Sequence, residues 1–390
     1  MLQRATTSDR REFTVSVATD LAGPGREWPG LRDLDALSAY IFQAREVLEI
    51  WLATIGLARR TQPLFVEVAL GDGTPVMMLA LGIERRGAVR VLTFLDGGVT
   101  DYNAPILFPA GRAIDAATMA GIWDRIVQVL PRFDSAVLEK IPAVVGDATN
   151  PLALIFTQAN ADSAHVLELA GSWKEYGATR MPRVRDSRRK RRNLSRIGAV
   201  DYRVAATQGE HDAFLEQMLR QKRRRYLETR GLDGLTRPGY LAYFRELTAR
   251  LAAGGYVHSS ALFCGDAIVA THWGLLCDRR LYSLMPGFAG EWTRYSPGRL
   301  LDEDLIAWCF ANGVTTLDFG AGDEPYKFEF GAERVAFTRA ELARTPIGAI
   351  HIGLVRARRR LGASTTGRLI KQAIAAVRRA LRRSRRGETA

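Results

Sequence analysis

The feature that most constrains the fold is an order of elements that occurs twice along the chain. In each half, a helical segment precedes two apolar segments joined by a tight turn that contains Gly-Asp, and a third apolar segment follows at once. The paired segments read LFVEVALGDGTPVMMLALGIERR and VHSSALFCGDAIVATHWGLLC. Long strands joined by tight turns and followed by a helix are the skeleton of an α+β sandwich. The sequence therefore predicts two mixed-sheet α/β units in tandem, related by a diverged repeat.

The length of the chain, 390 residues, also favours two domains over one. We expect helices at residues 34–57 and 115–130 in the first half and at 210–230 and 238–253 in the second. The expected division is an N-terminal extension over 1–30, a first domain over 31–150, a connecting segment over 151–185, a second domain over 186–335 and a basic tail over 354–390.

The chain shows no pattern for secretion or for crossing a membrane. Its first twenty residues are polar, and no apolar run approaches the roughly 20 residues that a spanning helix needs. We therefore expect a cytoplasmic protein. The three cysteines, Cys264, Cys277 and Cys309, form no Cys-x-x-Cys pair, and the histidines have no metal-ligand spacing. Buried thiols are favoured over a reactive nucleophile, and no metal is expected.

The net charge of +13 is concentrated at the C-terminal end. Residues 354–390 carry twelve Lys or Arg and one Glu, so the rest of the chain is nearly neutral and no DNA-binding surface is indicated. Apolar residues recur there at helical spacing: Leu369, Ile370, Ala373, Ile374, Val377 and Leu381. Such a basic amphipathic helix suits an anionic membrane surface, while a solvated, frayed terminal helix explains the pattern equally well.

A second basic block, RVRDSRRKRRNLSRIG, spans residues 183–198. It is predicted to be a helix that is solvated or that contacts a phosphorylated ligand. RNA binding is the weaker interpretation, because no aromatic residues interleave with the arginines to stack on bases.

The second half contains a candidate anion site at the start of a helix, in the segment RYSPGRLL. Ser296 and Pro297 are typical of the cap and the first helical position. The amides of Gly298, Arg299 and Leu300 would then point out of the helix start, and Arg294 and Arg299 would add positive charge. A phosphate or pyrophosphate fits such a site, although a capped helix that binds nothing has the same local pattern.

The segment DFGAGDEPYKFEFG, residues 318–331, packs acidic, phenolic and amine side chains into one glycine-rich turn after a strand. Its Asp-Phe-Gly also occurs in protein kinases, but the strand lysine and the His-Arg-Asp loop that a kinase needs are missing. Ligands meet the carboxyl ends of strands in open α/β sheets, so we expect this loop to face a reaction.

Several of these segments resemble the CelD/BcsL family of GNAT-type acetyltransferases. The resemblance rests on RYSPGRLL, LDFGAGDEPYKFEFGAE, the upstream RRKRRNLSR and the first-half TDYNAP, and it covers about residues 30–335. Proteins of this kind are similar in layout to the Fem aminoacyl transferases. The resemblance implies two GNAT-like acyl-CoA N-acyltransferase domains in tandem, the second of which carries the acyltransferase core.

The resemblance also implies an activity and its partners. Acyl-CoA, in particular acetyl-CoA, would be a co-substrate and not a permanently bound cofactor. The acceptor would be an amine or hydroxyl of a small molecule or saccharide, in exopolysaccharide, cellulose or cell-envelope synthesis, in a bacterial cytoplasm or at the inner membrane surface. The alternatives are a Fem-like ligase that takes an aminoacyl group from tRNA and a non-catalytic partner in polysaccharide assembly.

Acyl transfer needs a base for the acceptor and an acid or a cation for the leaving thiolate. We expect Asp318 or Glu324 to be the base and Tyr326 or Lys327 to serve the leaving group. Asp318 has the alternative role of capping its turn. His272, in the middle of a strand, is a reserve candidate, although a lone strand histidine is more often packed in a core.

Overall fold

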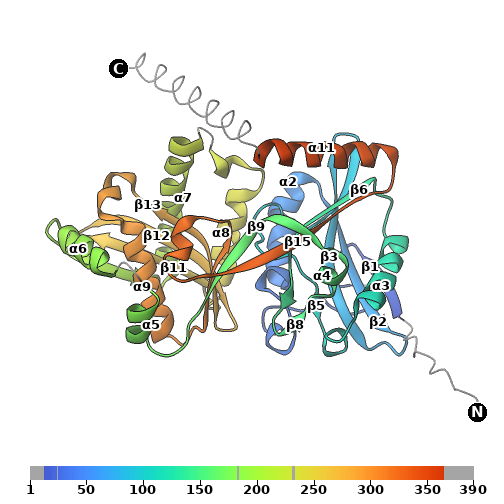
Figure 1. Cartoon of the computed structure of the whole chain (residues 1–390), viewed down its shortest axis with the longest axis horizontal. Coiled ribbons are helices and arrows are strands. Elements are labelled where there is room, and N and C mark those ends of the chain that lie inside the picture. The colour runs from blue at the N-terminus through green and yellow to red at the C-terminus, as the bar shows by residue number, and fades with distance from the viewer. Residues whose placement is uncertain (1–12, 24, 182–183, 231–232, 364–390) are drawn as a thin grey trace, which may run out of the picture. The chain divides into compact units, whose positions relative to one another are not determined.

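The computed structural model describes residues 13–23, 25–181, 184–230 and 233–363. They form two compact units (Figure 1). Unit 1 holds the chain up to Glu49, then Arg60–Asn160 and Phe337–Thr345. Unit 2 holds Ile50–Arg59, Ala161–Ala336 and the chain from Pro346 onward.

Unit 1 is built on a mixed sheet in the strand order β1-β2-β3-β4-β6-β15. Its strands are β1 (Phe13–Ala18), β2 (Gln62–Leu70), β3 (Pro75–Arg86), β4 (Val89–Phe94), β6 (Ser135–Pro142) and β15 (Glu333–Ala343). The short strand β5 (Ile106–Leu107) pairs with β3, and β7 (Val144–Val145) pairs with β8 (Ala148–Thr149). The helices that follow these strands are η4 (Pro109–Gly111), α3 (Ala116–Val129) and α4 (Pro151–Ile155). Asp115 caps α3, the helix expected over residues 115–130, by accepting a hydrogen bond from the amide of Thr118.

The single helix expected over residues 34–57 is wrong. The chain there forms short pieces: η1 (Leu34–Ala36), η2 (Ile41–Gln43), α1 (Arg45–Trp51), the π-helical turn η3 (Leu52–Gly56) and α2 (Leu57–Arg59). Within the π-turn, the hydroxyl of Thr54 donates to the carbonyl of Ile50, and a side chain at Gly56 would clash with Trp51 at 2.9 Å. Side-chain bonding to the preceding turn and a packed tryptophan reshape this helix, and its apolar periodicity does not show this.

Unit 2 repeats the plan with the strand order β10-β11-β12-β13-β14-β9. Its strands are β9 (Gln158–Glu168), β10 (Val200–Val204), β11 (Val257–Cys264), β12 (Ala267–Cys277), β13 (Arg280–Phe288) and β14 (Thr316–Ala321). Its helices are α5 (Trp173–Thr179), α6 (Val184–Ser195), α7 (Gln208–Arg230), η5 (Gly234–Thr236), α8 (Tyr240–Leu251), η6 (Gly290–Tyr295), α9 (Pro297–Ala311), α10 (Pro325–Phe328) and α11 (Pro346–Ala363).

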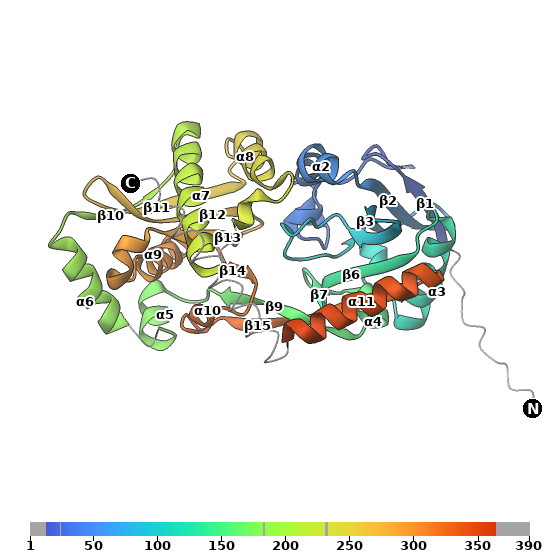
Figure 2. The same cartoon turned by 90° about the horizontal axis from the view of Figure 1, so that it is seen from above.

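The two faces of the sheet in unit 2 are covered by different helices (Figure 2). On one face, the indole of Trp273 donates to Thr248 of α8 at 2.9 Å. On the other, Leu262 and Ala270 pack with Leu194 of α6 and Leu300 of α9. β12 is buried from Val269 to Leu275, as its mostly apolar sequence predicts for a central strand. The mixed α/β architecture predicted from the sequence is confirmed.

The units differ in extent from the expected domains. Phe13–Ala18, placed in the N-terminal extension, form a strand that pairs with β2 along its whole length. Residues placed in the connecting segment form β9, which pairs with β14 of unit 2. After completing most of unit 2, the chain contributes one more strand to unit 1, because Phe337–Ala343 of β15 pair with β6. Strands whose partners lie this far away in the sequence carry little local signal of where they pair.

Candidate active site

The first element of the candidate site is a split between two neighbouring parallel strands. The two strands are paired only where Arg280–Tyr282 of β13 lie beside Thr316–Asp318 of β14. Beyond this point β13 stays with β12 as far as Phe288, and β14 stays with β9 as far as Ala321. The diverging edges therefore expose backbone N–H and C=O groups that no strand satisfies, which is where a ligand can be bound by the main chain.

A β-bulge lies on the diverging part of β13. The register passes from Trp273↔Met285 directly to Gly274↔Ser283, so Leu284 has no partner on β12. Bulges redirect the local backbone and leave its amides unpaired. The hydroxyl of Ser283 beside the bulge is buried and has no hydrogen-bond partner.

The second element is the start of α9, which follows η6 at the end of β13. Ser296 stands at the N-cap position as expected, but its backbone is left-handed, with φ 51° and ψ 52°, and its side chain makes no capping hydrogen bond. Its hydroxyl instead accepts a hydrogen bond from Nζ of Lys190, at 3.0 Å. The same ammonium donates to the carbonyl of Arg294 at 3.0 Å, so α6 brings a lysine to this helix start.

Two of the three amides expected at this helix start remain available. Pro297 has no N–H, and the amide of Leu300 donates to the carbonyl of Ser296 at 3.2 Å. The amides of Gly298 and Arg299 make no hydrogen bond in the part of the chain that the structure describes. A Cβ built on Gly298 would meet only the ring of Phe288, at an ordinary 3.5 Å. The backbone is therefore open to an anion here.

Of the two arginines expected to serve this site, one is committed elsewhere. The guanidinium of Arg299 is bonded to Glu329 at 2.7 Å and to Glu303 at 3.0 Å, and it lies over the ring of Phe330. Arg294 is exposed and stacks on Tyr295, with 4.7 Å from its guanidinium carbon to the ring centroid. Lys190 and Arg294 are thus the cations near the two open amides.

A cavity of about 70 Å³ lies between α7 and η6 in the same region. It is lined by Gln221, Arg224, Arg225, Glu228, Phe288, Gly290 and Thr293. The guanidinium of Arg225 lies over Phe288, the same ring that neighbours Gly298. The cavity adds two arginines to the surroundings of the helix start.

The loop after β14 is held by two of the residues expected to react. Asp318 is fully buried and accepts hydrogen bonds from Arg280 at 2.6 and 3.2 Å and from the amide of Gly320 at 2.8 Å. Lys327 is 2% exposed, and its ammonium donates to the carbonyls of Gly320 at 3.1 Å and Gly322 at 2.8 Å. These contacts fit a structural role for both side chains, which shape the loop and have little freedom to exchange protons with a substrate.

Glu324 and Tyr326 both come shortly before Lys327 in the sequence, but their surroundings differ. The carboxylate of Glu324 is 57% exposed and pairs with Lys327 at 3.0 Å. Tyr326 packs edge-on against Phe319, and burial, together with the charges of Asp302 and Glu324, raises its pKa. Tyr326 therefore keeps its proton at neutral pH, as a proton donor must.

Asp302 of α9 was not expected from the sequence. Its carboxyl is 5% exposed and forms no hydrogen bond or ion pair in the described residues. Burial, with the nearby Glu303, raises the pKa of Asp302 to about 8 in spite of Arg299. A carboxyl with such a raised pKa near Tyr326 is a candidate acid or base. Its only signal in the sequence is one acidic residue on the apolar stripe of α9.

His272 lies in the interior of the sheet. It is 1% exposed, its Nδ1 is 3.2 Å from Nδ1 of His258, and burial lowers its pKa to about 3. The ring of His258 packs against Trp308 of α9, with centroids 4.3 Å apart. Neutral, weakly basic imidazoles packed beneath a helix fit a core role.

The loop after β14 is also tied to β9 by residues that sequence reasoning missed. Asp323 accepts hydrogen bonds from the hydroxyl of Ser163 and from Nε2 of His165, the latter at 2.9 Å. These bonds, led by that of Ser163, lower the pKa of Asp323. The other ring nitrogen of His165 is buried without a partner. The partners are about 160 positions apart, so no local motif indicates them.

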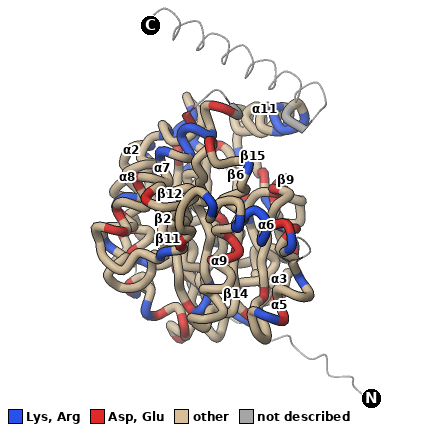
Figure 3. The backbone as a smooth tube through the Cα atoms, turned by 90° about the vertical axis from the view of Figure 1, so that its left-hand side faces the viewer, with Lys and Arg blue, Asp and Glu red and all other residues tan. Residues whose placement is uncertain are grey.

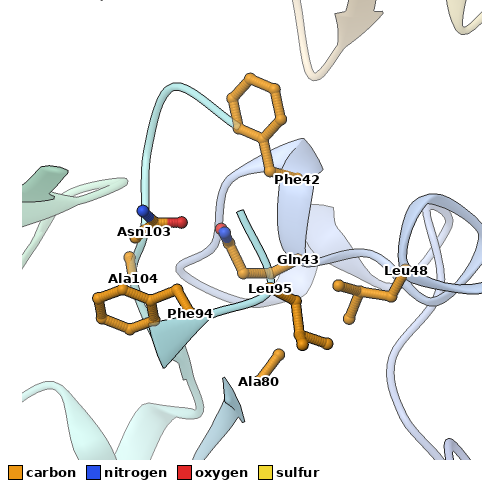
Figure 4. Close-up of a pocket in the computed structure, with 8 residues that line it drawn as sticks. All are labelled: Phe42, Gln43, Leu48, Ala80, Phe94, Leu95, Asn103 and Ala104. Atoms are coloured by element: carbon orange, nitrogen blue, oxygen red, sulfur yellow. The ribbon is translucent and has the colours of Figure 1, made fainter. Parts of the chain in front are cut away.

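In unit 1 the parallel strands β4 and β6 also separate, but little space is left near the end of β4. β4 and β6 pair only over Val91–Leu92 with Ser135–Ala136. A cavity of only about 10 Å³ lies there, lined by Phe42, Gln43, Leu48, Ala80, Phe94, Leu95, Asn103 and Ala104 (Figure 4). The loop after β4 is closed by an ion pair between Asp96 and Lys140 at 2.8 Å. This space holds little more than one water molecule.

The described residues contain no group of three or more His, Cys, Asp or Glu side chains placed to hold a metal ion. Their helices are all too short or too polar to span a membrane.

Comparison with known proteins agrees with this geometry. Residues 182–328, which belong to unit 2, match the model of the GNAT acetyltransferase domain. Among solved structures, FemX is similar over 80% of this chain and 94% of its own, with a TM-score of 0.54 and 10% identity. A search of curated protein sequences finds no match.

Two other solved structures resemble the chain more loosely. A tandem GNAT protein from the clavulanic acid biosynthesis pathway has 14% identity and a TM-score of 0.46, covering 85% of this chain and 100% of its own. L-PGS from Bacillus licheniformis has 12% identity and a TM-score of 0.45, covering 80% of this chain and 95% of its own. At these identities the FemX similarity shows the fold alone.

Proposed function

We propose that unit 2 transfers an acyl group from acyl-CoA to an amine or hydroxyl acceptor. The observation that carries the proposal is the strand split between β13 and β14, which lies in the same GNAT domain as a helix start with two open amides. The pyrophosphate of CoA would bind the amides of Gly298 and Arg299, with Lys190 and Arg294 supplying charge. The thioester would enter the split, where unpaired amides at the Leu284 bulge can stabilise a developing oxyanion.

The reaction also needs two proton transfers, one from the acceptor to a base and one from an acid to the leaving thiolate. The acceptor nitrogen or oxygen attacks the thioester carbonyl and loses its proton to a base, and the C–S bond then breaks to release a thiolate that takes up a proton. Asp302 and Glu324 are the candidates for the base, and Tyr326 is the candidate for the acid. Asp318 and Lys327, expected from the sequence to react, would serve by holding the loop in place.

The acceptor class follows from the resemblance to the CelD/BcsL family. We propose a saccharide or other small molecule of exopolysaccharide or cell-envelope synthesis, acted on in the cytoplasm or at the inner membrane surface. A chain that lacks CoA binding but still associates with the polysaccharide machinery would instead be a non-catalytic assembly partner.

A second function, transfer of an aminoacyl group from tRNA, is favoured by one observation on α6. Its inner face is docked, with Arg191 bonded to Asp304 at 2.7 Å and Leu194 fully buried. Exposed arginines that make no ion pair in the described residues lie along α6 and directly after it: Arg185, Arg188, Arg192 and Arg196. Figure 3 marks the Lys and Arg positions along the backbone. Like charges at this spacing weaken a helix by about 0.2–0.5 kcal/mol per pair, and a polyanion would relieve that repulsion.

The test is CoA affinity measured beside turnover in Gly298→Val. A Val side chain at the open position would block close approach of the phosphates, whereas the only protein neighbour of its Cβ is Phe288 at 3.5 Å. We expect CoA binding to be lost and the protein to stay folded. Gly209→Val is the matched control, because Gly209 is also the second residue of its helix and has nothing within 4 Å of a built Cβ.

Unchanged CoA affinity in folded Gly298→Val would overturn the cofactor assignment. Salt-dependent binding of tRNA, reduced in an Arg188→Glu/Arg192→Glu variant and accompanied by no CoA binding, would decide for the second function.

A further inference from the structure

Helix α11 exposes a stripe of large apolar side chains. Ile347, Ile350, Leu354 and Leu361 are 41%, 65%, 65% and 64% exposed, respectively. Spaced three, four and seven residues apart, they share one face of the helix. Gly348 and Ile352, on the opposite side, are buried, and Ile352 is 4% exposed.

This exposure is unusual within the molecule. In the described part of the chain, the other large apolar side chains that are exposed are scattered singly: Leu57, Val129, Val144, Ile197 and Phe328. Scattered apolar residues are normal on a soluble surface, whereas a contiguous stripe marks a binding surface. The stripe therefore needs an occupant.

The positive charge of α11 indicates which kind of partner binds the apolar stripe. Pro346–Ala363 contains no Asp or Glu but four arginines, Arg356, Arg358, Arg359 and Arg360. A second copy of α11 would bring arginines against arginines and could form none of the ion pairs that flank a helix–helix seam. An anionic lipid surface complements both features, since apolar side chains enter the acyl boundary while arginines meet phosphates.

We propose that α11 lies flat on an anionic lipid surface, with Ile350 and Leu354 at the centre of the inserted stripe. Residues 364–390 extend the basic character in sequence, with eight more Lys or Arg and one Glu. The proposal goes beyond acyl transfer and depends on no residue of the candidate active site.

The experiment is flotation of the full chain with vesicles of phosphatidylcholine alone or mixed with phosphatidylglycerol. We expect binding only to the anionic vesicles, weakened by salt because exposed charges are screened. Ile350→Glu/Leu354→Glu should bind at least tenfold more weakly. Leu57→Glu/Ile197→Glu, which adds the same charge at two exposed apolar positions elsewhere, should bind like the parent chain.

A second variant, Ile350→Ser/Leu354→Ser, separates insertion from charge. It should also lose binding, whereas retention of full binding by both α11 variants would place the contact in the tail and overturn the proposal. Absence of parent binding to anionic vesicles would overturn it as well. So would a concentration-dependent dimer that the Ser variant dissolves, because the stripe would then pair with a second copy.

Discussion

Replacing Asp318 by asparagine tests whether this carboxylate supports the reaction loop or reacts. Asn keeps the shape of the side chain but removes the charge from a pair in which Asp318 is fully buried and Arg280 is 24% exposed. Removing one partner of a buried pair typically destabilises by 3–5 kcal/mol, and the partial exposure of Arg280 places the expected loss at the lower end, about 3 kcal/mol. For a unit of this size that corresponds to roughly 6–12 °C in Tm.

The assay is a thermal melt together with turnover per folded molecule. We expect the whole of this destabilisation of about 3 kcal/mol and only a small change in turnover. The reason is that Asp318 already accepts three hydrogen bonds within the protein. Asp266→Asn is the control, since this exposed turn carboxylate makes no bond in the described residues. A general base would behave in the opposite way. A fall in turnover of roughly 10²–10⁴-fold with an unmoved Tm would refute the structural role.

Two further predictions concern neighbouring charges. The folded pKa of Asp302 is raised to about 8 by burial, so its contribution to stability is present in full below pH 4 and is lost as the pH rises to 8. Asp302→Asn should therefore reduce the downward slope of stability over this window, by up to about 1.4 kcal/mol per pH unit, as denaturant melts at several pH values will show. An unchanged slope would mean that Asp302 titrates normally. Lys327→Met should loosen residues 320–322, since the ammonium holds their carbonyls, and amide exchange in this loop should quicken while that of β11 does not. Equal protection of the loop in both proteins would contradict its assigned role.

The regular elements were predictable because their causes are local. The paired strands around Gly265-Asp266 and the helix capped by Asp115 follow from periodicity and turn chemistry within a few residues. The start of α9 at Pro297 is likewise encoded in its own sequence. The sequence therefore predicts where the candidate anion site lies.

The roles of individual site residues were harder to predict, since they depend on distant partners. Whether Asp318 is a free carboxylate depends on Arg280, 38 positions away, and the conformation of Ser296 involves Lys190, 106 positions away. Asp302 acquires its raised pKa from burial, which depends on how α9 packs. No pattern over a window of residues contains this information.

The return of the chain to unit 1 has a consequence for how the protein is made. β6 receives its partner strand only from Phe337–Ala343, after all of Ala161–Ala336 has been synthesised. At ordinary rates of translation this delay is roughly 10–35 s, during which the edge of β6 in the nascent chain lacks the strand that completes it. Bare strand edges template association with other chains. The emerging N-terminal half is thus expected to need protection on the ribosome until the last strand arrives, and a fragment that stops before residue 337 would keep that edge permanently.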